Sequence, residues 1–188
     1  MLTIYLVRHG ETVENRAGIL QGCTHGHLNE VGKEQVEGLR RKLDGLQFDA
    51  IVSSDLKRAM DSARILNKSF NLPVEECVLL RERDWGTLTG VLCEEAKKLE
   101  RFPDSVETLG QGMNRAVEFL NAMFEKYDGK KILAVGHGFI NRCILAAASG
   151  VARNEIPRIA NAECRIIRIE NRISYLFKEE GKDEASAN

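Results

Sequence analysis

The sequence predicts a three-layer α/β/α sandwich with a mainly parallel central sheet flanked by helices, and two observations lead to this prediction. First, short runs rich in Ile, Val and Leu, typical of strands buried on both faces, alternate with segments that have the helical period of apolar residues. Second, 188 residues correspond to about one domain, which is large enough to bury a core without disulfide bonds. Strand and helix patterns that alternate along one domain favour helices on both faces of a parallel sheet.

Short apolar runs mark the predicted strands. The parallel strands are expected at Leu2–Val7, Ala50–Val52, Val78–Leu80 and Ile132–Val135. Two further runs, Cys164–Ile169 and Ile173–Phe177, are separated only by Glu170–Arg172 and predict a closing β-hairpin.

The segments between these runs predict helices. Asn29 can cap the first of them, and Ser54 or Asp55 can cap the second. A longer helix is expected from about residue 104 to residue 127, and another over Phe139–Ser149.

The pattern predicts one domain over residues 1–177, with a small cap insertion at about 91–104. Residues 178–188 are charged or small and predict a flexible C-terminal tail. The sequence contains no internal repeat and no Pro- or Gly-rich linker that would divide the domain.

The charge balance and the cysteine pattern limit the partners and the compartment. The formal net charge of −1 gives no general reason to expect nucleic acid or an anionic membrane surface as a partner. The apolar run Met1–Val7 lacks the basic start of a signal peptide, and Ile132–Ala152 contains polar side chains that exclude a spanning helix. Five widely spaced cysteines without a CxxC motif are typical of reduced thiols, so we expect a cytoplasmic protein. The oligomeric state stays open between monomer and homodimer.

Charged residues and glycines follow the ends of the four predicted parallel strands. These segments are Arg8–Glu11, Ser53–Arg58, Arg81–Gly86 and Gly136–Gly138. Because ligands of open α/β sheets bind outside the carboxyl ends of the strands, we expect these side chains to converge on one rim. Glycine in the two His-Gly steps lets the backbone turn sharply and lets its N–H groups approach a ligand closely.

These residue types suit the transfer of a phosphoryl group. Arginine is a permanently charged fork that matches phosphate oxygens, and histidine can act as a neutral nucleophile near pH 7. Attack on phosphorus needs such a nucleophile, cations for the equatorial oxygens and a proton donor for the leaving oxygen. His9 is available as the nucleophile and Glu82 as the proton donor. The group available to support the equatorial oxygens is Arg8, Arg58 and His137. The sequence contains no GxxxxGK[ST], GxSxG or HExxH motif, which removes the common phosphate-loop, serine-hydrolase and zincin interpretations.

The order and spacing of these motifs resemble the histidine phosphatase superfamily, also called phosphoglycerate mutase-like. The resemblance runs from residue 4 to about residue 150 and implies a phosphoglycerate mutase-like fold. The matching segments are Leu6–Thr12, Asn15, Gln21–Gly22, Ser53–Ala59, Leu80–Gly86 and Gly136–Gly138.

The resemblance implies a role for each matching residue. The catalytic set would be His9, Glu82, Arg8, Arg58 and His137. The substrate-binding set would be Asn15, Gln21, Gly22 and Gly138. His9 would carry the phosphoryl group, and Glu82 would donate the proton and later help water to attack. The resemblance implies no metal ion and no other cofactor, and the partner would be a small-molecule phosphate ester.

Three features leave alternatives open. The loop Cys23–His27 departs from the pattern of many relatives and can be an exposed loop, a specificity loop over the pocket or a metal site built on its cysteine and histidines. Glu11 or Asp84 could supply the proton in place of Glu82. Trp85 is expected to be an anchor in the core or at the rim of the pocket, with stacking on the substrate as the alternative.

The sequence favours a metal-independent phosphomonoesterase, with a phosphoglycerate mutase as the alternative. The stretch from 91 to 102 is short, whereas the cofactor-dependent mutases that this chain resembles usually carry a longer insertion there. A small cap lets water reach the phosphohistidine and so favours hydrolysis over transfer back to a product. A non-catalytic phosphate-binding module is less favoured because no pocket residue is missing. A metal-dependent hydrolase is disfavoured because arginines beside metal ligands would repel the cation.

Overall fold

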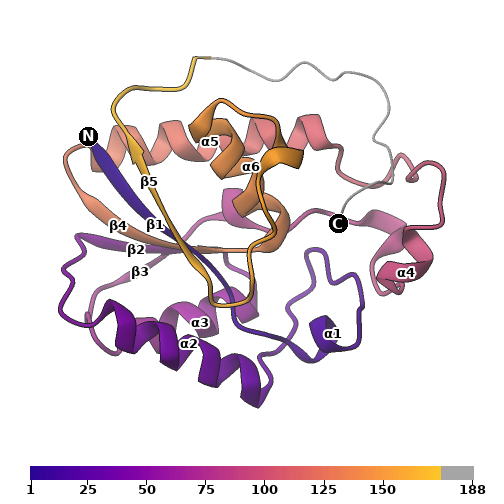
Figure 1. Ribbon diagram of the computed structural model, residues 1–188, viewed down its shortest axis with the longest axis horizontal. Helices are drawn as coiled ribbons and strands as arrows, with labels where there is room; N and C mark the ends of the chain where they lie inside the picture. Colours follow the sequence, from indigo (N-terminus) through magenta and orange to yellow (C-terminus); the bar gives the residue numbers. More distant parts are fainter. Residues whose placement is uncertain (175–188) are drawn as a thin grey trace.

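Four of the predicted apolar runs, together with Val74–Glu76, form one sheet in the computed structural model of the chain, which describes residues 1–174. The strands lie in the order β3-β2-β4-β1-β5 (Figure 1). Their bounds are β1 Leu2–Arg8, β2 Ala50–Ser53, β3 Val74–Glu76, β4 Lys131–Gly136 and β5 Cys164–Ile169. The first four are mutually parallel where they pair, and β5 alone of the described strands runs antiparallel, against β1. The mainly parallel sheet is therefore confirmed.

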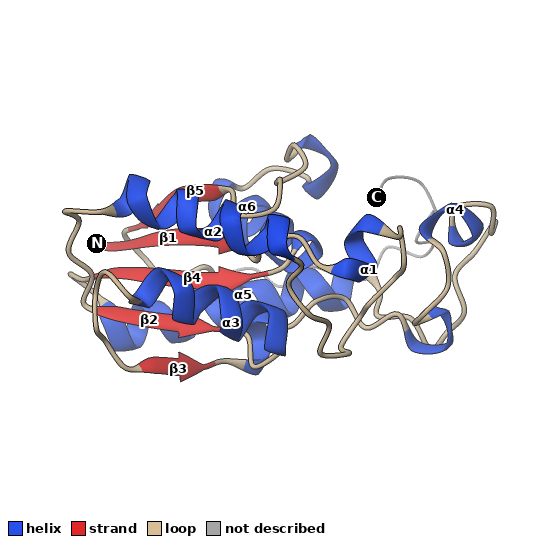
Figure 2. Ribbon diagram, turned by 90° about the horizontal axis from the view of Figure 1, so that it is seen from below, coloured by secondary structure: helices blue, strands red, loops and turns tan. Residues whose placement is uncertain are grey.

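Helices cover both faces of the sheet, which confirms the predicted sandwich. The long helices are α2 Glu30–Leu43, α3 Lys57–Asn67, α5 Leu109–Tyr127 and α6 Gly138–Ser149. Figure 2 shows α2 and α3 in front of the sheet, with α5 and α6 behind it. The short helices α1 Val13–Arg16 and α4 Cys93–Ala96 lie beyond the carboxyl ends of the parallel strands, on the side to which the strand arrows point. Single 3₁₀ turns occur at Val78–Leu80, Gly86–Leu88 and Arg153–Glu155.

Apolar side chains fill both interlayer spaces and one smaller space under α4. Leu120 of α5 and Ile144 of α6 pack on one face of the sheet, and Val36 of α2 and Ala63 of α3 pack on the other. A third cluster outside the sheet surrounds Trp85, which is 5% exposed. None of the helices described in residues 1–174 is long and apolar enough to cross a membrane.

The prediction of a strand at Val78–Leu80 is wrong. The strand that pairs with β2 is Val74–Glu76, and its register ends where Ser53 faces Glu76. The chain then turns, because the N–H of Leu80 donates to the carbonyl oxygen of Cys77 at 3.1 Å. Since β3 lies at the edge of the sheet and two of its three residues are glutamates, its sequence lacks the apolar run of a central strand.

Two helix starts also differ from the prediction. Helix α5 begins at Leu109 and not at about residue 104, because Thr108 and Gln111 form a capping box. The N-cap of α3 is Leu56 and not Ser54 or Asp55. The Ser54 hydroxyl accepts from the N–H of Leu56 at 3.3 Å, and the Asp55 carboxylate instead binds a guanidinium from another segment. The predicted Asn29 cap of α2 is confirmed.

The closing hairpin is confirmed only in its first strand, β5. Ile173 does not pair with β5, because its backbone N–H and carbonyl oxygen bond to the side chain of Asn121 on α5, at 2.8 and 2.9 Å. The rest of the second predicted strand, from 175 to 177, and the predicted tail 178–188 lie outside the described residues.

Candidate active site

His9 and His137 lie side by side at the carboxyl ends of two neighbouring strands. His9 follows β1 and His137 follows β4, and these strands pair in a register that places Arg8 opposite Gly136. The centroids of the two imidazole rings are 4.9 Å apart, at an interplanar angle of 61°. Their side chains are almost fully buried, with 2% of His9 and 0% of His137 exposed. The predicted convergence at one rim is therefore realised for these two residues.

The hydrogen bond of the His9 ring determines which nitrogen is free. Its Nδ1 lies 2.7 Å from the carbonyl oxygen of Gly10. Because a carbonyl oxygen can only accept, Nδ1 carries the proton and Nε2 keeps its lone pair. Burial first, and then the positive charges of Arg58 and Arg8, lower the pKa of His9 well below its ordinary value of 6.5. The ring is therefore a neutral imidazole whose Nε2 is available as a nucleophile.

Ser54 holds the second histidine. The Ser54 hydroxyl oxygen lies 2.9 Å from Nε2 of His137. Burial, followed by the charge of Arg58, lowers the pKa of His137 well below 6.5. Nδ1 of His137 is buried and has no hydrogen-bond partner among residues 1–174. The sequence does not predict the contact with Ser54, because serines at a strand end are most often turn or capping residues.

Arg8 and Arg58 place guanidinium groups beside the two rings. One Nη of Arg8 donates to the carbonyl oxygen of Ile159 at 2.7 Å. Arg58 is 1% exposed, and one of its Nη atoms donates to the carbonyl oxygen of Gly22 at 2.8 Å. In both arginines Nε is buried without a hydrogen-bond partner in the described part of the chain. Burial lowers the pKa of both guanidinium groups from the ordinary value of 12.5, and the charge of Glu82 opposes this effect.

Glu82 lies at the N-terminus of α6, where backbone N–H groups are available. Its Oε2 accepts from the N–H of Gly138 at 3.1 Å, and its Oε1 accepts from those of Phe139 and Arg83, both at 3.0 Å. The two alternative proton donors are held elsewhere. The Glu11 carboxylate accepts from Asn29 at 2.6 Å, and that of Asp84 accepts from the N–H of Gly86 at 2.8 Å.

Arg115 of α5 fixes the segment that carries Glu82. Its guanidinium donates to the carbonyl oxygens of Leu79 and Arg81, at 2.9 and 2.6 Å. The same group forms a two-pronged ion pair with Glu107, at 2.9 and 2.8 Å, and the two side chains are only 18% and 13% exposed. Arg115 is therefore a positioning residue for the glutamate.

We expect Arg115→Met to lower the free energy of unfolding by about 2–4 kcal/mol, because it leaves a largely buried carboxylate and two carbonyl groups without their donor. We also expect kcat for a phosphate monoester to fall several-fold as Glu82 loses its position. Chemical denaturation and steady-state kinetics measure the two effects. The matched control is Arg101→Met, since Arg101 pairs with Asp104 at the surface with 77% of its side chain exposed, and we expect a change below about 0.5 kcal/mol there. Equal losses in both variants would contradict the role of Arg115.

The residues predicted to bind substrate all line the same pocket as His9 and Glu82. The Asn15 amide oxygen accepts from Asn161 at 3.3 Å, and Gln21 is 7% exposed. Gly22 has a φ of +53°, a conformation that favours glycine, and its carbonyl oxygen accepts from the guanidinium of Arg58. Gly138 contributes the backbone N–H that binds Glu82.

The loop Cys23–His27 is tied to the pocket through Arg58. The carbonyl oxygens of Thr24 and His25 both accept from the Arg58 guanidinium, the second at 3.2 Å. In the described part of the chain, no group of three or more His, Cys, Asp or Glu side chains lies close enough to hold a metal ion. The loop thus holds a pocket arginine in place through its backbone, and none of residues 23–27 lines the pocket itself. Trp85, as expected, is a buried anchor that also lines the pocket.

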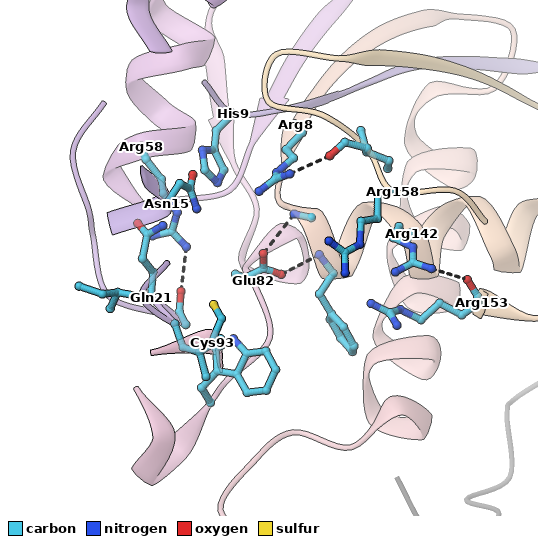
Figure 3. Close-up of a pocket in the computed structure, with 17 residues that line it drawn as sticks. Arg8, His9, Asn15, Gln21, Arg58, Glu82, Cys93, Arg142, Arg153 and Arg158 are labelled. Atoms are coloured by element: carbon cyan, nitrogen blue, oxygen red, sulfur yellow. Dashed lines mark hydrogen bonds between the residues drawn. The ribbon is translucent and has the colours of Figure 1, made fainter. Parts of the chain in front are cut away.

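A cavity of about 220 Å³ joins these residues and reaches three arginines that were not predicted from the sequence (Figure 3). They are Arg142, Arg153 and Arg158. Arg142 lies on α6, and the other two lie in the loop that leads into β5. Because β5 is antiparallel, this loop ends at the same edge of the sheet as the carboxyl ends of the parallel strands. The direction of β5 is the signal that could have located them.

The two buried histidines make stability depend on pH. Their pKa values in the folded state lie below 6.5, so below that pH the unfolded chain binds more protons than the folded one. The stabilisation is therefore complete above about pH 6.5 and is lost as the pH falls from there towards the folded-state pKa values. We expect the free energy of unfolding to fall by about 1.4 kcal/mol per histidine for each pH unit in that range. Urea denaturation at several pH values measures the slope, and His9→Gln should roughly halve it; an unchanged slope in that variant would contradict the assignment.

Comparisons with known proteins agree with the geometry. The sequence profile of the histidine phosphatase superfamily (branch 1) matches residues 4–174. The chain is 36% identical over 154 residues to the uncharacterized phosphatase PhoE of Bacillus subtilis strain 168, covering 80% of this chain and 79% of that protein. It is 31% identical over 182 residues to the metal-independent phosphoserine phosphatase of Arabidopsis thaliana, covering 88% and 76% of the two chains. The solved structure of YhfR from Bacillus stearothermophilus matches with a TM-score of 0.85 over 98% of this chain and 99% of that one, at 23% identity, which shows a shared fold.

Proposed function

We propose that this chain, which belongs to branch 1 of the histidine phosphatase superfamily, hydrolyses phosphate monoesters of small metabolites through a phosphohistidine at His9. The observation that carries the proposal is the state of the His9 ring. Its Nδ1 donates to the Gly10 carbonyl oxygen, so the unprotonated Nε2 is free in a pocket lined by guanidinium groups. A neutral imidazole among fixed cations is the arrangement that attack on a phosphate dianion requires.

In the first half-reaction, Nε2 of His9 attacks phosphorus, and an N–P bond forms as the P–O bond to the alcohol breaks. Three buried nitrogens around the His9 ring have no hydrogen-bond partner among residues 1–174: Nε of Arg8, Nε of Arg58 and Nδ1 of His137. We assign them to the equatorial phosphate oxygens. The Ser54 hydroxyl can donate to Nε2 of His137, which leaves a proton on Nδ1 for this contact.

Glu82 supplies the proton that the leaving alcohol oxygen needs. Its Oε1 accepts two backbone hydrogen bonds and its Oε2 accepts only one. We therefore assign the proton to Oε2, because fewer of its lone pairs are occupied by hydrogen bonds. In the second half-reaction, water attacks the phosphohistidine and gives a proton to the Glu82 carboxylate. The N–P bond breaks, inorganic phosphate leaves and both residues return to their starting states.

The remaining pocket residues shape the site around these groups. Asn15 and Gln21 would bind the ester from the side of the loop that Arg58 holds. Gly22 and Gly138 would let the backbone approach the ester closely, because glycine has no side chain. The segment from 91 to 104 would act as a small cap, since α4 within it contributes Cys93 to the pocket wall. A short cap leaves water access to the phosphohistidine, which favours hydrolysis.

The direct test is hydrolysis of p-nitrophenyl phosphate by the purified protein, with and without EDTA. We expect the same rate in both, since neither half-reaction uses a metal ion and the arginines of the pocket would repel one. Activity that disappears on chelation and returns with a divalent cation would contradict the mechanism. Binding of phosphate without any turnover would favour the non-catalytic alternative.

Phosphoglycerate mutase activity is the second candidate, because it shares the first half-reaction. A mixture of 3-phosphoglycerate and 2,3-bisphosphoglycerate separates the two functions. We expect release of inorganic phosphate to outpace equilibration of the phosphoglycerate isomers, and the reverse order would assign a mutase.

We also propose that the protein works in the cytoplasm on a small-molecule phosphate ester, with no nucleic acid or membrane as partner. The five cysteines all lie in the described part of the chain, and each has a free thiol. Free thiols are typical of a reducing compartment. Fractionation of cells that express a tagged chain tests this location.

A further inference from the structure

The pocket contains a second group of cations that the proposed hydrolysis does not use. We call Arg142, Arg153 and Arg158 the arginine cluster. In Figure 3, His9 and Arg58 lie at one end of the pocket and the arginine cluster lies at the other, with Glu82 between them.

Arg142 fixes the loop that carries the other two members of the cluster. Its side chain is 7% exposed, and it donates from Nε to the carbonyl oxygen of Ile156 at 3.0 Å and from Nη2 to that of Arg153 at 3.1 Å. The guanidinium carbon of Arg153 lies 4.8 Å from the centroid of the Phe139 ring, and this cation–π contact helps to hold the guanidinium group in place. Arg142 and Arg153 are therefore built into the wall of the pocket, and Arg158 is an exposed side chain on the same loop.

The positive charge of the cluster is not neutralised by the protein. None of its three guanidinium groups forms an ion pair with a carboxylate in residues 1–174, and Nε of Arg153 is buried there without a hydrogen-bond partner. Burial first, and then the charge of Arg153, lower the pKa of Arg142. The charge of Arg158 reaches Arg8 as well, at the phosphate end of the pocket. Like charges held together in a pocket favour an anion that offsets their repulsion.

We propose that the arginine cluster binds a second anionic group of the substrate, a carboxylate or a second phosphate, while the scissile phosphate lies at His9. This inference rests on the proposed function, and it narrows the substrate class to short phosphate monoesters with a negative charge at the far end. Guanidinium forks bind carboxylate and phosphate oxygens in pairs, and Arg158 is exposed to the pocket and makes no competing ion pair in the described residues.

Matched substrate pairs test the proposal. The first pair is 3-phosphoglycerate and glycerol 3-phosphate of the same configuration, which differ by a carboxylate in place of a hydroxymethyl group. The second pair is fructose 1,6-bisphosphate and fructose 6-phosphate, which differ by one phosphate. We expect kcat/KM to favour the more anionic member of at least one pair by about tenfold. The pair that shows the preference identifies the anion.

Arg158→Gln should reduce that preference to near unity, because it removes the charge and keeps much of the length of the side chain. Arg168→Gln is the matched control, since Arg168 is an exposed arginine of β5 that does not line the pocket, and there we expect no change. Equal kcat/KM values within both pairs, measured on a chain that does hydrolyse them, would overturn the inference and leave the proposed function standing.

Binding measurements separate the inference from catalysis. In His9→Ala protein, titration calorimetry should give a Kd about tenfold lower for the anionic member of the preferred pair, and Arg158→Gln should abolish the difference. Equal Kd values within both pairs would overturn the inference even if the wild-type chain were inactive. Failure of wild-type protein to hydrolyse p-nitrophenyl phosphate would instead count against the proposed function alone.

Discussion

Replacing His9 by alanine is expected to lower kcat for phosphate-ester hydrolysis by about four orders of magnitude or more. Alanine offers no nitrogen to accept the phosphoryl group, so water would have to attack the ester directly. The guanidinium groups of Arg8 and Arg58 remain, and we therefore expect KM to change much less than kcat. Steady-state kinetics with p-nitrophenyl phosphate, followed to long times with concentrated protein, measures the residual rate.

The matched control for this variant is His27→Ala, since His27 is an exposed histidine of the loop beside the pocket. We expect kcat within about twofold of wild type for that variant. Because His9 is 2% exposed, its removal also leaves a cavity, so thermal unfolding should be recorded to show that the protein is folded in the assay. A loss of less than tenfold in a folded His9→Ala protein would exclude this imidazole as the nucleophile.

Replacing Glu82 by glutamine is expected to slow the hydrolysis of esters with poor leaving groups far more than that of esters with good ones. An alkoxide needs a proton as the P–O bond breaks, whereas p-nitrophenolate can leave without one, so the loss of the acid affects only the first. We expect kcat/KM to fall by about 10²–10³-fold for glycerol 3-phosphate and by less than tenfold for p-nitrophenyl phosphate. The ratio kcat/KM reports the steps up to formation of the phosphohistidine and is therefore not affected by slow hydrolysis of that intermediate.

Asp84→Asn and Glu11→Gln are the controls for the Glu82 variant, because these carboxylates were the alternative proton donors in the sequence. Both are engaged by other groups in the structure, through Gly86 and Asn29. We expect neither variant to change the ratio of the two kcat/KM values. A dependence on the leaving group that appears in one of them, and not in Glu82→Gln, would reassign the proton donor.

The half of the site built on strand ends could be predicted from the sequence. Parallel strands that pair in register bring the residues that follow them to one edge, and β1 and β4 do this for His9 and His137. The residue types then suggest the chemistry without knowledge of any distance. Arg8 ends β1 and Arg58 follows β2, so the same rule places them, whereas Glu82 follows a 3₁₀ turn that was predicted as a strand. The structure places all three in one pocket.

The other half of the site depends on directions and contacts that local patterns do not contain. Arg153 and Arg158 belong to the pocket because β5 runs antiparallel to β1, and an apolar run does not reveal its direction. Ser54 contacts His137 through a side-chain geometry that a turn serine shares with many others. The misplaced strand at Val78–Leu80 has a similar cause, because three apolar residues fit a 3₁₀ turn as well as a strand.

The central claim is that the phosphoryl group becomes bound to Nε2 of His9, and trapping the intermediate tests it most directly. Wild-type protein is mixed with ³²P-labelled p-nitrophenyl phosphate, quenched in alkali within milliseconds, and digested for mass spectrometry. The account predicts a phosphoramidate that is stable to base and labile to acid, located on His9, and absent from His9→Ala protein. Label on any other residue, or turnover with no covalent label at the shortest times, would contradict it.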